Sequence, residues 1–459
     1  MADGPRAVIL AAGQGTRMRS ARPKVLHPIA GRPMLLHAVE AAGTATGSLP
    51  LVVLGPGHEE VAEAVSGLAE TVIQPEPRGT GDALRSVPLQ LRGQGQVVVA
   101  YGDLPLLRAE TISGLIRTHQ ATGAACVLLS VVPTDPSGLG RVVRGTSGRV
   151  ERIVEDRDLP PGGPIPAECN AGVYVFSGSR LWPALDRLSA DNAQGELYLT
   201  DVIAQLAPDV EAVLAGDPEE ALGINDRVQL AAAEGILRRR LVESLMLAGV
   251  TVDDPATTYL DVGVQVGADT VLRPMTTLRG GTVIGRSCRI GPMAIVSDTH
   301  AGDRVSIGAS VIEGAEIGDG VEIGHFNRIR PGSVLASGVS LGTHAEVKNS
   351  RVGEGTRIQH WACVLDSDVG AGVNIGAGTV TCNYDGTDKH RTVIEDGVFV
   401  GSNSSLVAPL RIGGDAYVAA ASVVTRDVPS GALAIGRARQ HVIEGWRGRP
   451  RARTEPADG

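Results

Sequence analysis

The chain has 459 residues, of which 43% are hydrophobic and 20% are charged, and its formal net charge is −9. This length is too great for one ordinary core, so two or three well-packed domains are expected. The negative charge argues against broad nucleic-acid binding, although a small phosphorylated substrate needs only a local basic pocket.

Cysteine usage and hydropathy indicate the compartment. Five cysteines are scattered without CxxC pairs, an odd count that suits a reducing environment and offers no zinc site: Cys126, Cys169, Cys288, Cys363 and Cys382. The N-terminus has no basic segment followed by a long apolar stretch, and no apolar run reaches the roughly 18 residues of a membrane span. We therefore expect a cytoplasmic protein with no membrane partner.

The first motif is "AVILAAGQGTRM", residues 7–18. An apolar run typical of a buried strand ends at Gly13 and Gly15, where the backbone can turn sharply and approach a ligand closely. Backbone amides at such a turn can point at phosphate oxygens. The motif predicts a phosphate-binding loop, with a plain tight turn as the alternative.

Apolar runs alternate with helical patterns up to about residue 225, as in "LVVLG", "EEVAEAVSGLAE", "QVVVAYGD" and "AETISGLIRTHQATG". This alternation predicts a mostly parallel sheet covered on both faces, with ligands at the carboxyl ends of its strands. "LAAGQGTRM", "VLGPGHEE" and "YGDLPL" all fall at such ends. Asp103 in the last of these offers a hard oxygen that suits Mg²⁺, although a strand-ending aspartate can also cap a helix.

A long helical pattern over residues 227–249 predicts a connecting helix. Beyond it, aliphatic residues recur every six positions, on registers that include Leu272, Leu278, Ile284, Ile290 and Val296, then Val305, Val311, Ile317, Ile323 and Ile329, and finally Ile394, Val400, Leu406, Ile412, Val418 and Val424. A period of six fits neither a helix nor a single strand, and predicts a parallel β-helix with three short strands per coil. The insertion "TCNYDGTDKHRT", residues 381–392, must leave this prism as a loop, which is where repeat scaffolds usually hold their chemistry.

The motif set resembles a known family. "LAAGQGTRM", "PKVLHPIAGRPML", "QPEPRGTGDA", "YGDLPLL", "GLGRVV", "IVEDRD", "CNAGVYVF", "NAQGELYLTD" and "GINDRVQL" are similar to the motifs of nucleotidyltransferases that act on sugar 1-phosphates. With hexapeptide repeats that carry "EVKNS", "GAGTVTCNYDG" and "VGSNSSLVAP", nearly the whole chain resembles the bacterial bifunctional N-acetylglucosamine-1-phosphate uridylyltransferases and glucosamine-1-phosphate acetyltransferases.

The resemblance implies a domain plan and an activity. The plan is an α/β Rossmann-like nucleotidyltransferase domain (1–226), a connecting helix (227–249), an all-β left-handed parallel β-helix of hexapeptide repeats (250–437) and a basic tail (438–459). The second half would acetylate glucosamine 1-phosphate with acetyl-CoA. The first would then transfer UMP from UTP to the product with Mg²⁺, releasing pyrophosphate and yielding UDP-N-acetylglucosamine for cell-wall precursors. Family members of this shape form homotrimers with active sites between neighbouring prisms.

Uridylyl transfer needs cations that converge on the glycine loop. Arg17 and Lys24 are the candidates for the pyrophosphate leaving group and the α-phosphate, and the resemblance makes Asp103 and Asn225 the magnesium ligands. It also places these residues in the nucleotide-sugar pocket: Leu10, Ala11, Ala12, Gly13, Lys24, Gln74, Gly79, Thr80, Tyr101, Gly102, Asp103, Gly140, Glu155, Asn170 and Asn225. Gln74 with the Gly79–Thr80 backbone would read uracil, because an amide matches a donor and an acceptor. Glu155 and Asn170 would bind sugar hydroxyls.

Acetyl transfer needs a base for the amine proton and a donor for the oxyanion. His360 is the candidate base by family alignment. Arg330 and Lys348 would clamp the sugar phosphate, and Asn374, Asn383 and Tyr384 would orient the substrate and acetyl group. The acetyl-CoA groove would be lined by Ala377, Asn383, Tyr384, Ser402, Ala420 and Arg437.

The sequence departs from the family pattern after His360. Cys363 stands where the family has a substrate-holding tyrosine, and Leu365 replaces a usual glycine. Loss of that phenol would cost on the order of 1 to 3 kcal/mol if its partner stays unpaired. Two alternatives therefore stay open: a single-activity nucleotidyltransferase whose repeats only assemble the protein, and a non-catalytic regulatory assembly.

Overall fold

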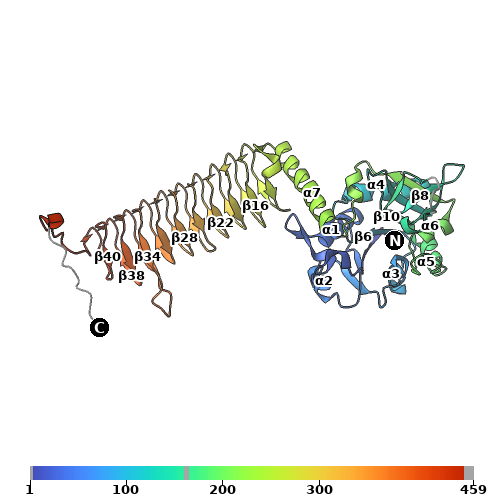
Figure 1. Ribbon diagram of the computed structural model, residues 1–459, viewed down its shortest axis with the longest axis horizontal. Coiled ribbons are helices and arrows are strands. Elements are labelled where there is room, and N and C mark those ends of the chain that lie inside the picture. Colours follow the sequence, from blue (N-terminus) through green and yellow to red (C-terminus); the bar gives the residue numbers. More distant parts are fainter. Residues whose placement is uncertain (1–3, 160–164, 449–459) are drawn as a thin grey trace, which may run out of the picture. The chain divides into compact units, whose positions relative to one another are not determined.

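The computed structural model describes residues 4–159 and 165–448, and separates the chain into two units (Figure 1). The first comprises the chain up to Ser244 together with Leu260–Val262, and the second comprises Leu245–Tyr259 and the chain from Gly263 onward. The last part of the expected basic tail, from residue 449, lies outside the described residues.

A nine-stranded sheet forms the centre of the first unit, in the order β11-β7-β10-β6-β1-β4-β5 with the hairpin β8–β9 beside β10. Its strands are β1 (Arg6–Ala11), β4 (Leu51–Leu54), β5 (Glu70–Ile73), β6 (Gln96–Tyr101), β7 (Cys126–Val131), β8 (Arg141–Arg144), β9 (Val150–Val154), β10 (Cys169–Ser177) and β11 (Val210–Leu214). The path from β6 through β1 and β4 to β5 is parallel, while β10 runs antiparallel to both β6 and β7. The sheet is thus mostly parallel, as predicted.

Helices cover both faces of this sheet. They are α1 (Met34–Thr46), α2 (Glu59–Ala64), α3 (Thr80–Arg85), α4 (Ala109–Thr122), α5 (Gly178–Leu185), α6 (Asp201–Leu206) and α7 (Arg227–Leu247). Strand β1 shows why two layers are needed: Ile9 packs with α1 and α4 residues on one face, while Val8 and Leu10 pack with α3, α5 and α6 residues on the other. A strand buried on both faces is apolar at every position, as "AVILA" is.

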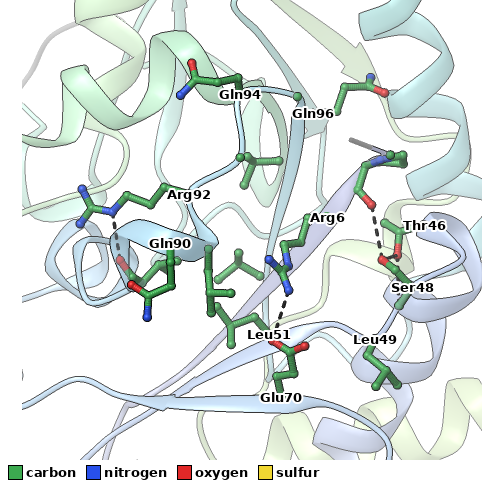
Figure 2. Close-up of a pocket in the computed structure, with 18 of the residues that line it drawn as sticks. Arg6, Thr46, Ser48, Leu49, Leu51, Glu70, Gln90, Arg92, Gln94 and Gln96 are labelled. Carbon is green, nitrogen blue, oxygen red and sulfur yellow. Dashed lines mark hydrogen bonds and ion pairs between the residues drawn. The ribbon is translucent and has the colours of Figure 1, made fainter. Parts of the chain in front are cut away.

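The two rims of the sheet differ. The carboxyl ends of β1 and β6 lie side by side, where the Gly102 amide donates to the Leu10 carbonyl at 3.0 Å. The opposite rim holds a cavity of about 790 Å³, in which Arg6 pairs with Glu70 at 3.2 Å (Figure 2). None of the predicted site residues lines that cavity, so it is separate from the predicted site.

The second unit is a three-sided ladder of short strands (Figure 1). Its first sheet contains β12 (Thr251–Val252), β15 (Val271–Leu272), β18 (Arg289–Ile290), β21 (Ser306–Ile307), β24 (Glu322–Ile323), β27 (Ser340–Leu341), β30 (Arg357–Ile358), β33 (Asn374–Ile375), β36 (Phe399–Val400), β39 (Tyr417–Val418) and β41 (Leu433–Ala434). Its second contains β13 (Tyr259–Leu260), β16 (Thr277–Arg279), β19 (Ile295–Ser297), β22 (Val311–Glu313), β25 (Arg328–Ile329), β28 (Glu346–Lys348), β31 (Cys363–Leu365), β34 (Val380–Cys382), β37 (Ser405–Val407) and β40 (Val423–Val424). Its third contains β14 (Gln265–Val266), β17 (Val283–Ile284), β20 (His300–Ala301), β23 (Glu316–Ile317), β26 (Val334–Leu335), β29 (Arg351–Val352), β32 (Ser367–Val369), β35 (Thr392–Ile394) and β38 (Leu410–Ile412).

One part of the predicted register is wrong. Ile307 and Ile312 face the interior, paired with Ile290 and Val296, whereas Val311 lies on the outer side of β22. The corners near Ala309 and Gly314 are shorter than their neighbours, so the inward position shifts along the sequence. The six-residue spacing of Val305 and Val311 therefore does not reflect the coil register.

The loop at 383–391 leaves the prism between β34 and β35, as the interrupted repeat predicts (Figure 1, orange). The predicted fold class, an α/β Rossmann-like domain followed by a left-handed parallel β-helix of short repeats, is confirmed. Among the helices of the described residues, none has the length and apolar character to cross a membrane.

Candidate active sites

The glycine loop places Lys24. Gly15 has φ of 63°, in the left-handed region, and an added Cβ there would lie 2.4 Å from Cβ of Lys24. Gly13, by contrast, has no positive φ, and its Cβ position faces open space with no atom within 4 Å. The sharp turn is therefore made by Gly15 alone, while Gly13 leaves room beside the backbone for a ligand.

Four predicted residues converge at this rim. Nζ of Lys24 lies 2.5 Å from Oδ2 of Asp103 and 3.3 Å from Oδ1 of Asn225. Nη2 of Arg17 donates to the same Asn225 oxygen at 2.9 Å. Two cations and two hard oxygen donors thus form one cluster, as the predicted roles require.

Backbone contacts assemble this cluster from distant segments. Lys24 begins a short 3-10 helix, η2 (Lys24–Leu26), and Asp103 follows β6. The Ile224 amide donates to the Asp103 carbonyl at 3.0 Å, which brings "GIND" to the rim. The Asn225 amide donates to Oε1 of Gln229 at 2.7 Å, so the first turn of α7 fixes the orientation of Asn225.

The proposed base-reading residues are tied to one another. Nε2 of Gln74 donates to the Gly79 carbonyl at 3.3 Å and to Oδ2 of Asp82 at 2.9 Å. Oγ1 of Thr80 accepts from the Leu199 amide at 3.0 Å. The Gln74 side-chain nitrogen is therefore used inside the protein.

The proposed sugar-binding residues lie around Glu155. Oγ1 of Thr200 donates to Oε1 of Glu155 at 2.7 Å, and Nδ2 of Asn170 donates to the Tyr174 hydroxyl at 2.6 Å. Gly140 accepts from the Asn170 amide at 2.8 Å, and an added Cβ at Gly140 would meet Ile153 at 2.8 Å. A side chain at position 140 would therefore clash with Ile153 and press against Glu155.

Burial raises the pKa of two acidic side chains around this site, Glu155 and Tyr101. Burial raises the pKa of Glu155, although the Thr200 hydrogen bond acts in the opposite direction. Burial, followed by the charge of Glu155, raises the pKa of Tyr101, whose hydroxyl also hydrogen-bonds Thr80 and Tyr174. Tyr101 therefore stays a neutral donor at any working pH.

The sequence reasoning missed three residues of this site. Thr200 holds Glu155, Gln229 holds Asn225, and Tyr198 is only 7% exposed with a hydroxyl that has no hydrogen-bond partner in the described chain. Two of these residues, Tyr198 and Thr200, lie in the motif "NAQGELYLTD", which is the sequence signal that points to them. The remaining predicted members, Leu10 to Gly13, lie where β1 ends and its loop begins.

The β-helix places part of the acetyltransferase set on one corner. His360, Ala377, Ser402 and Ala420 each follow an inward aliphatic residue by two positions, and those aliphatic residues pair with one another across β30, β33, β36 and β39. The four residues therefore form a column on consecutive coils at the corner between the first and second sheets, which we call the first corner. His360, Ser402 and Ala420 are exposed.

A second group lies on the second sheet and at the corner that follows it, which we call the second corner. Nη1 of Arg330 lies 3.0 Å from Oε1 of Glu346, and Nζ of Lys348 lies 3.9 Å from Oδ2 of Asp366. Asn383 also donates to Asp366 at this corner, and the Tyr384 hydroxyl donates to the Gly386 carbonyl at 2.6 Å.

Cys363 lies beside Glu346 on the neighbouring strand. Burial, followed by the Glu346 charge, raises the pKa of Cys363, so its thiol stays protonated and poorly nucleophilic. Leu365 is the register partner of Lys348. The two positions thus present a protonated thiol and an aliphatic side chain beside Glu346 and Lys348.

The two groups are not joined within one chain. In the part of the chain that the structure describes, no side-chain hydrogen bond or ion pair links the first-corner column with Arg330, Lys348 or the loop. Asn374 lies on the outer side of the first sheet, and Arg437 is exposed beyond β41.

Comparison with known proteins covers both units. Residues 7–209 match the family described as "MobA-like NTP transferase domain". A "Bifunctional protein GlmU" of Heliobacterium modesticaldum is 45% identical over 96% of this chain and 98% of its own length. Proteins of the same name from Thermobifida fusca (46%, 99% of this chain and 97% of theirs) and Pelobacter propionicus (45%, 98% and 99%) are similar over both units as well.

Proposed function

Because this chain belongs to the GlmU family of bifunctional proteins, we propose that it makes UDP-N-acetylglucosamine in two steps. The second unit acetylates glucosamine 1-phosphate with acetyl-CoA. The first unit transfers UMP from UTP to N-acetylglucosamine 1-phosphate and releases pyrophosphate. The observation that carries uridylyl transfer is the convergence of Arg17, Lys24, Asp103 and Asn225 at one rim.

In uridylyl transfer, two cationic side chains of the first unit bind the triphosphate of UTP. Lys24 neutralises the α-phosphate and Arg17 the leaving pyrophosphate, so that negative charge that develops on transfer meets fixed positive charge. The Cβ position of Gly13 faces open space, which leaves room for a phosphate beside the backbone of the loop. Glu155, held by Thr200, accepts hydrogen bonds from the sugar and keeps its phosphate in line.

The donor set at this rim fits Mg²⁺. The oxygens of Asp103 and Asn225 both already face a cation, which identifies them as the electronegative part of the cluster. Mg²⁺ favours such oxygen ligands, so Asp103 and Asn225 would hold it at this rim. When bound, the ion would polarise the phosphates and neutralise part of their charge.

In acetyl transfer, His360 takes the proton of the attacking amine while Arg330 and Lys348 hold the sugar phosphate. Asn383 and Tyr384 orient the acceptor and the acetyl carbonyl. Ala377, Ser402 and Ala420 are small or short residues in one column with His360, which suits a groove for the extended acetyl-CoA molecule. Arg437 would pair with its phosphates.

We further propose a homotrimer whose acetyl-transfer sites lie between chains. His360 is exposed, and beside its column a row of large residues at the first corner is exposed too, with Phe326 at 61% and Trp361 at 66%. The His344 ring lies between them in tilted contacts, with ring centroids 5.1 Å from Phe326 and 6.0 Å from Trp361. A second copy that covers this row would bury apolar surface and close the groove beside His360.

The five free thiols support a reducing compartment, and we place the reaction in the cytoplasm.

An assay that follows two products tests the function. The purified protein is given glucosamine 1-phosphate, acetyl-CoA, UTP and Mg²⁺, while free thiol and pyrophosphate are followed separately. We expect thiol release first and pyrophosphate release that depends on it. A protein that releases no thiol from glucosamine 1-phosphate and acetyl-CoA, but releases pyrophosphate when N-acetylglucosamine 1-phosphate is supplied with UTP, would instead support the single-activity alternative.

A further inference from the structure

Asp366 lies at the second corner, between β31 and β32. Its side chain is buried, with 6% of the residue exposed, and its φ of 46° is in the left-handed region. Aspartate tolerates that region better than most residues with a Cβ. A buried acid in an unusual backbone conformation needs partners that compensate its charge.

The carboxylate of Asp366 contacts three side chains from two other segments. Oδ1 accepts from Nδ2 of Asn349 at 2.6 Å, and Oδ2 accepts from Nδ2 of Asn383. Nζ of Lys348 lies 3.9 Å from the same Oδ2. A single carboxylate thus contacts the proposed phosphate clamp, Lys348, and the first residue of the loop that leaves the prism.

The backbone of Asp366 binds the other side of the same loop. Its amide donates to the Lys348 carbonyl at 3.0 Å, and its carbonyl accepts from the Thr392 amide at 3.3 Å, where the loop re-enters the third sheet. Asp366 therefore ties both ends of the loop 383–391 to the strand that carries Lys348.

Charge is part of this arrangement. Burial alone would raise the pKa of Asp366, but hydrogen bonds from Asn349 and Asn383 and the positive charges of Lys348 and Lys389 outweigh it and lower the pKa. The carboxylate is therefore ionised at neutral pH, and the two amides are charge-assisted donors.

We propose that Asp366 is a positioning residue for acetyl transfer, which holds Lys348 and Asn383 at a fixed separation so that the sugar phosphate and the acetyl group meet His360 in one geometry. This inference rests on the proposed function, because it takes Lys348 and Asn383 as substrate contacts. Misplacement of such contacts by about 1 Å can cost on the order of 100-fold in rate.

The test compares Asp366→Asn with Asp298→Asn in the full-length protein. Asp298 occupies the same corner of an earlier coil with the same φ of 46°, but its carboxylate binds only the Gly281 amide among the described hydrogen bonds. Arg391 still anchors the loop to Asp368 at 2.7 Å in both variants, so the fold is expected to persist. We expect Asp366→Asn to lower kcat of acetyl transfer by about 10- to 100-fold, with KM for acetyl-CoA within about threefold. Pyrophosphate release from supplied N-acetylglucosamine 1-phosphate and UTP should be unchanged, and Asp298→Asn should change neither activity.

Two readouts separate positioning from a merely structural effect. Because Asp366 acts through Asn383, adding Asn383→Ala to Asp366→Asn should lower kcat far less than the product of the two single effects. Hydrogen exchange at loop amides 384–391 should quicken in Asp366→Asn but not in Asp298→Asn. Full acetyl transfer in Asp366→Asn, or multiplicative effects of the two substitutions, would overturn the inference. If the wild type itself transfers no acetyl group, the proposed function fails, and unchanged loop exchange in Asp366→Asn would then reject the role of Asp366 independently.

Discussion

The ammonium nitrogen of Lys24 lies 2.5 Å from Oδ2 of Asp103, although 79 residues separate the two in the chain. Their side chains are only 12% and 20% exposed. Each compensates the other's charge. The Lys24 contact uses Oδ2 of Asp103, and a carboxylate has a second oxygen that can accept a further ligand.

Lys24→Met tests the cationic half of this pair. It removes a fixed charge that faces the phosphates, so we expect kcat/KM for pyrophosphate release to fall by about 100- to 1,000-fold, the range for loss of one preorganised electrostatic contact. Acetyl transfer by the same protein is the internal control and should stay unchanged. An equal loss of both activities would point to unfolding rather than to a role for Lys24.

Asp103→Asn tests the metal-binding half. The amide keeps an oxygen but loses the charge, so the Mg²⁺ concentration for half-maximal pyrophosphate release should rise about tenfold or more. A second measurement does not depend on turnover: the gain in Tm from Mg²⁺ with UTP should shrink in the variant. An unaltered Mg²⁺ dependence would remove Asp103 from the ligand set.

Gly15→Ala tests the turn that places Lys24. Its Cβ would lie 2.4 Å from Cβ of Lys24, and a left-handed alanine costs about 1 to 2 kcal/mol of stability. Gly47→Ala is the matched control, because Gly47 has a similar φ of 66° and no atom near its Cβ position. Both variants should lose stability in urea titrations through the left-handed φ, and Gly15→Ala should lose more because of its close approach to Lys24. Only Gly15→Ala should also lose pyrophosphate release. Equal activities would show that the close approach is relieved at no functional cost.

Glu155→Gln tests the buried carboxyl through pH. Burial raises the pKa of Glu155 in the folded protein, so the folded state binds more protons than the unfolded state between the two pKa values. The stability linked to Glu155 is complete below its unfolded pKa, near 4.3, and is lost as pH rises through the folded pKa. Glutamine keeps the acceptor for Thr200 without charge. Its unfolding free energy relative to wild type should therefore increase with pH over this window, and a flat difference would contradict the raised pKa.

Phe326→Asp tests the assembly. Aspartate tolerates the left-handed φ of 62° at this position but places a charge in the exposed row at the first corner. We expect sedimentation velocity to show smaller species and acetyl transfer to be lost. Pyrophosphate release from supplied N-acetylglucosamine 1-phosphate and UTP should be retained. Leu89→Asp is the control, since Leu89 is 77% exposed in the first unit. A trimer that persists in Phe326→Asp would place the interface elsewhere.

Much of the fold was predictable because it depends on local repeats of hydrophobicity. The apolar run 7–11 is buried on both faces, and the six-residue period describes coils whose inward residues stack in register. The predicted register is wrong at Val305 and Val311, because shorter corners move the inward position of the strands to Ile307 and Ile312. Val305 and Val311 are aliphatic and six residues apart by chance. A corner's length depends on its backbone turn, which the spacing of aliphatic residues does not report.

The sequence by itself determined the order of the motifs, the fold class and the residue types available for phosphate, metal and sugar, because these follow from local pattern and resemblance. Only the tertiary structure decided which of them meet. It joined Lys24 to Asp103, gave Glu155 its partner Thr200, and made Asp366 the tie between Lys348 and Asn383. The physical reason is that hydrogen bonds and ion pairs act over a few ångströms in space, and distance along the chain does not reveal which side chains the sheet and the coils bring that close.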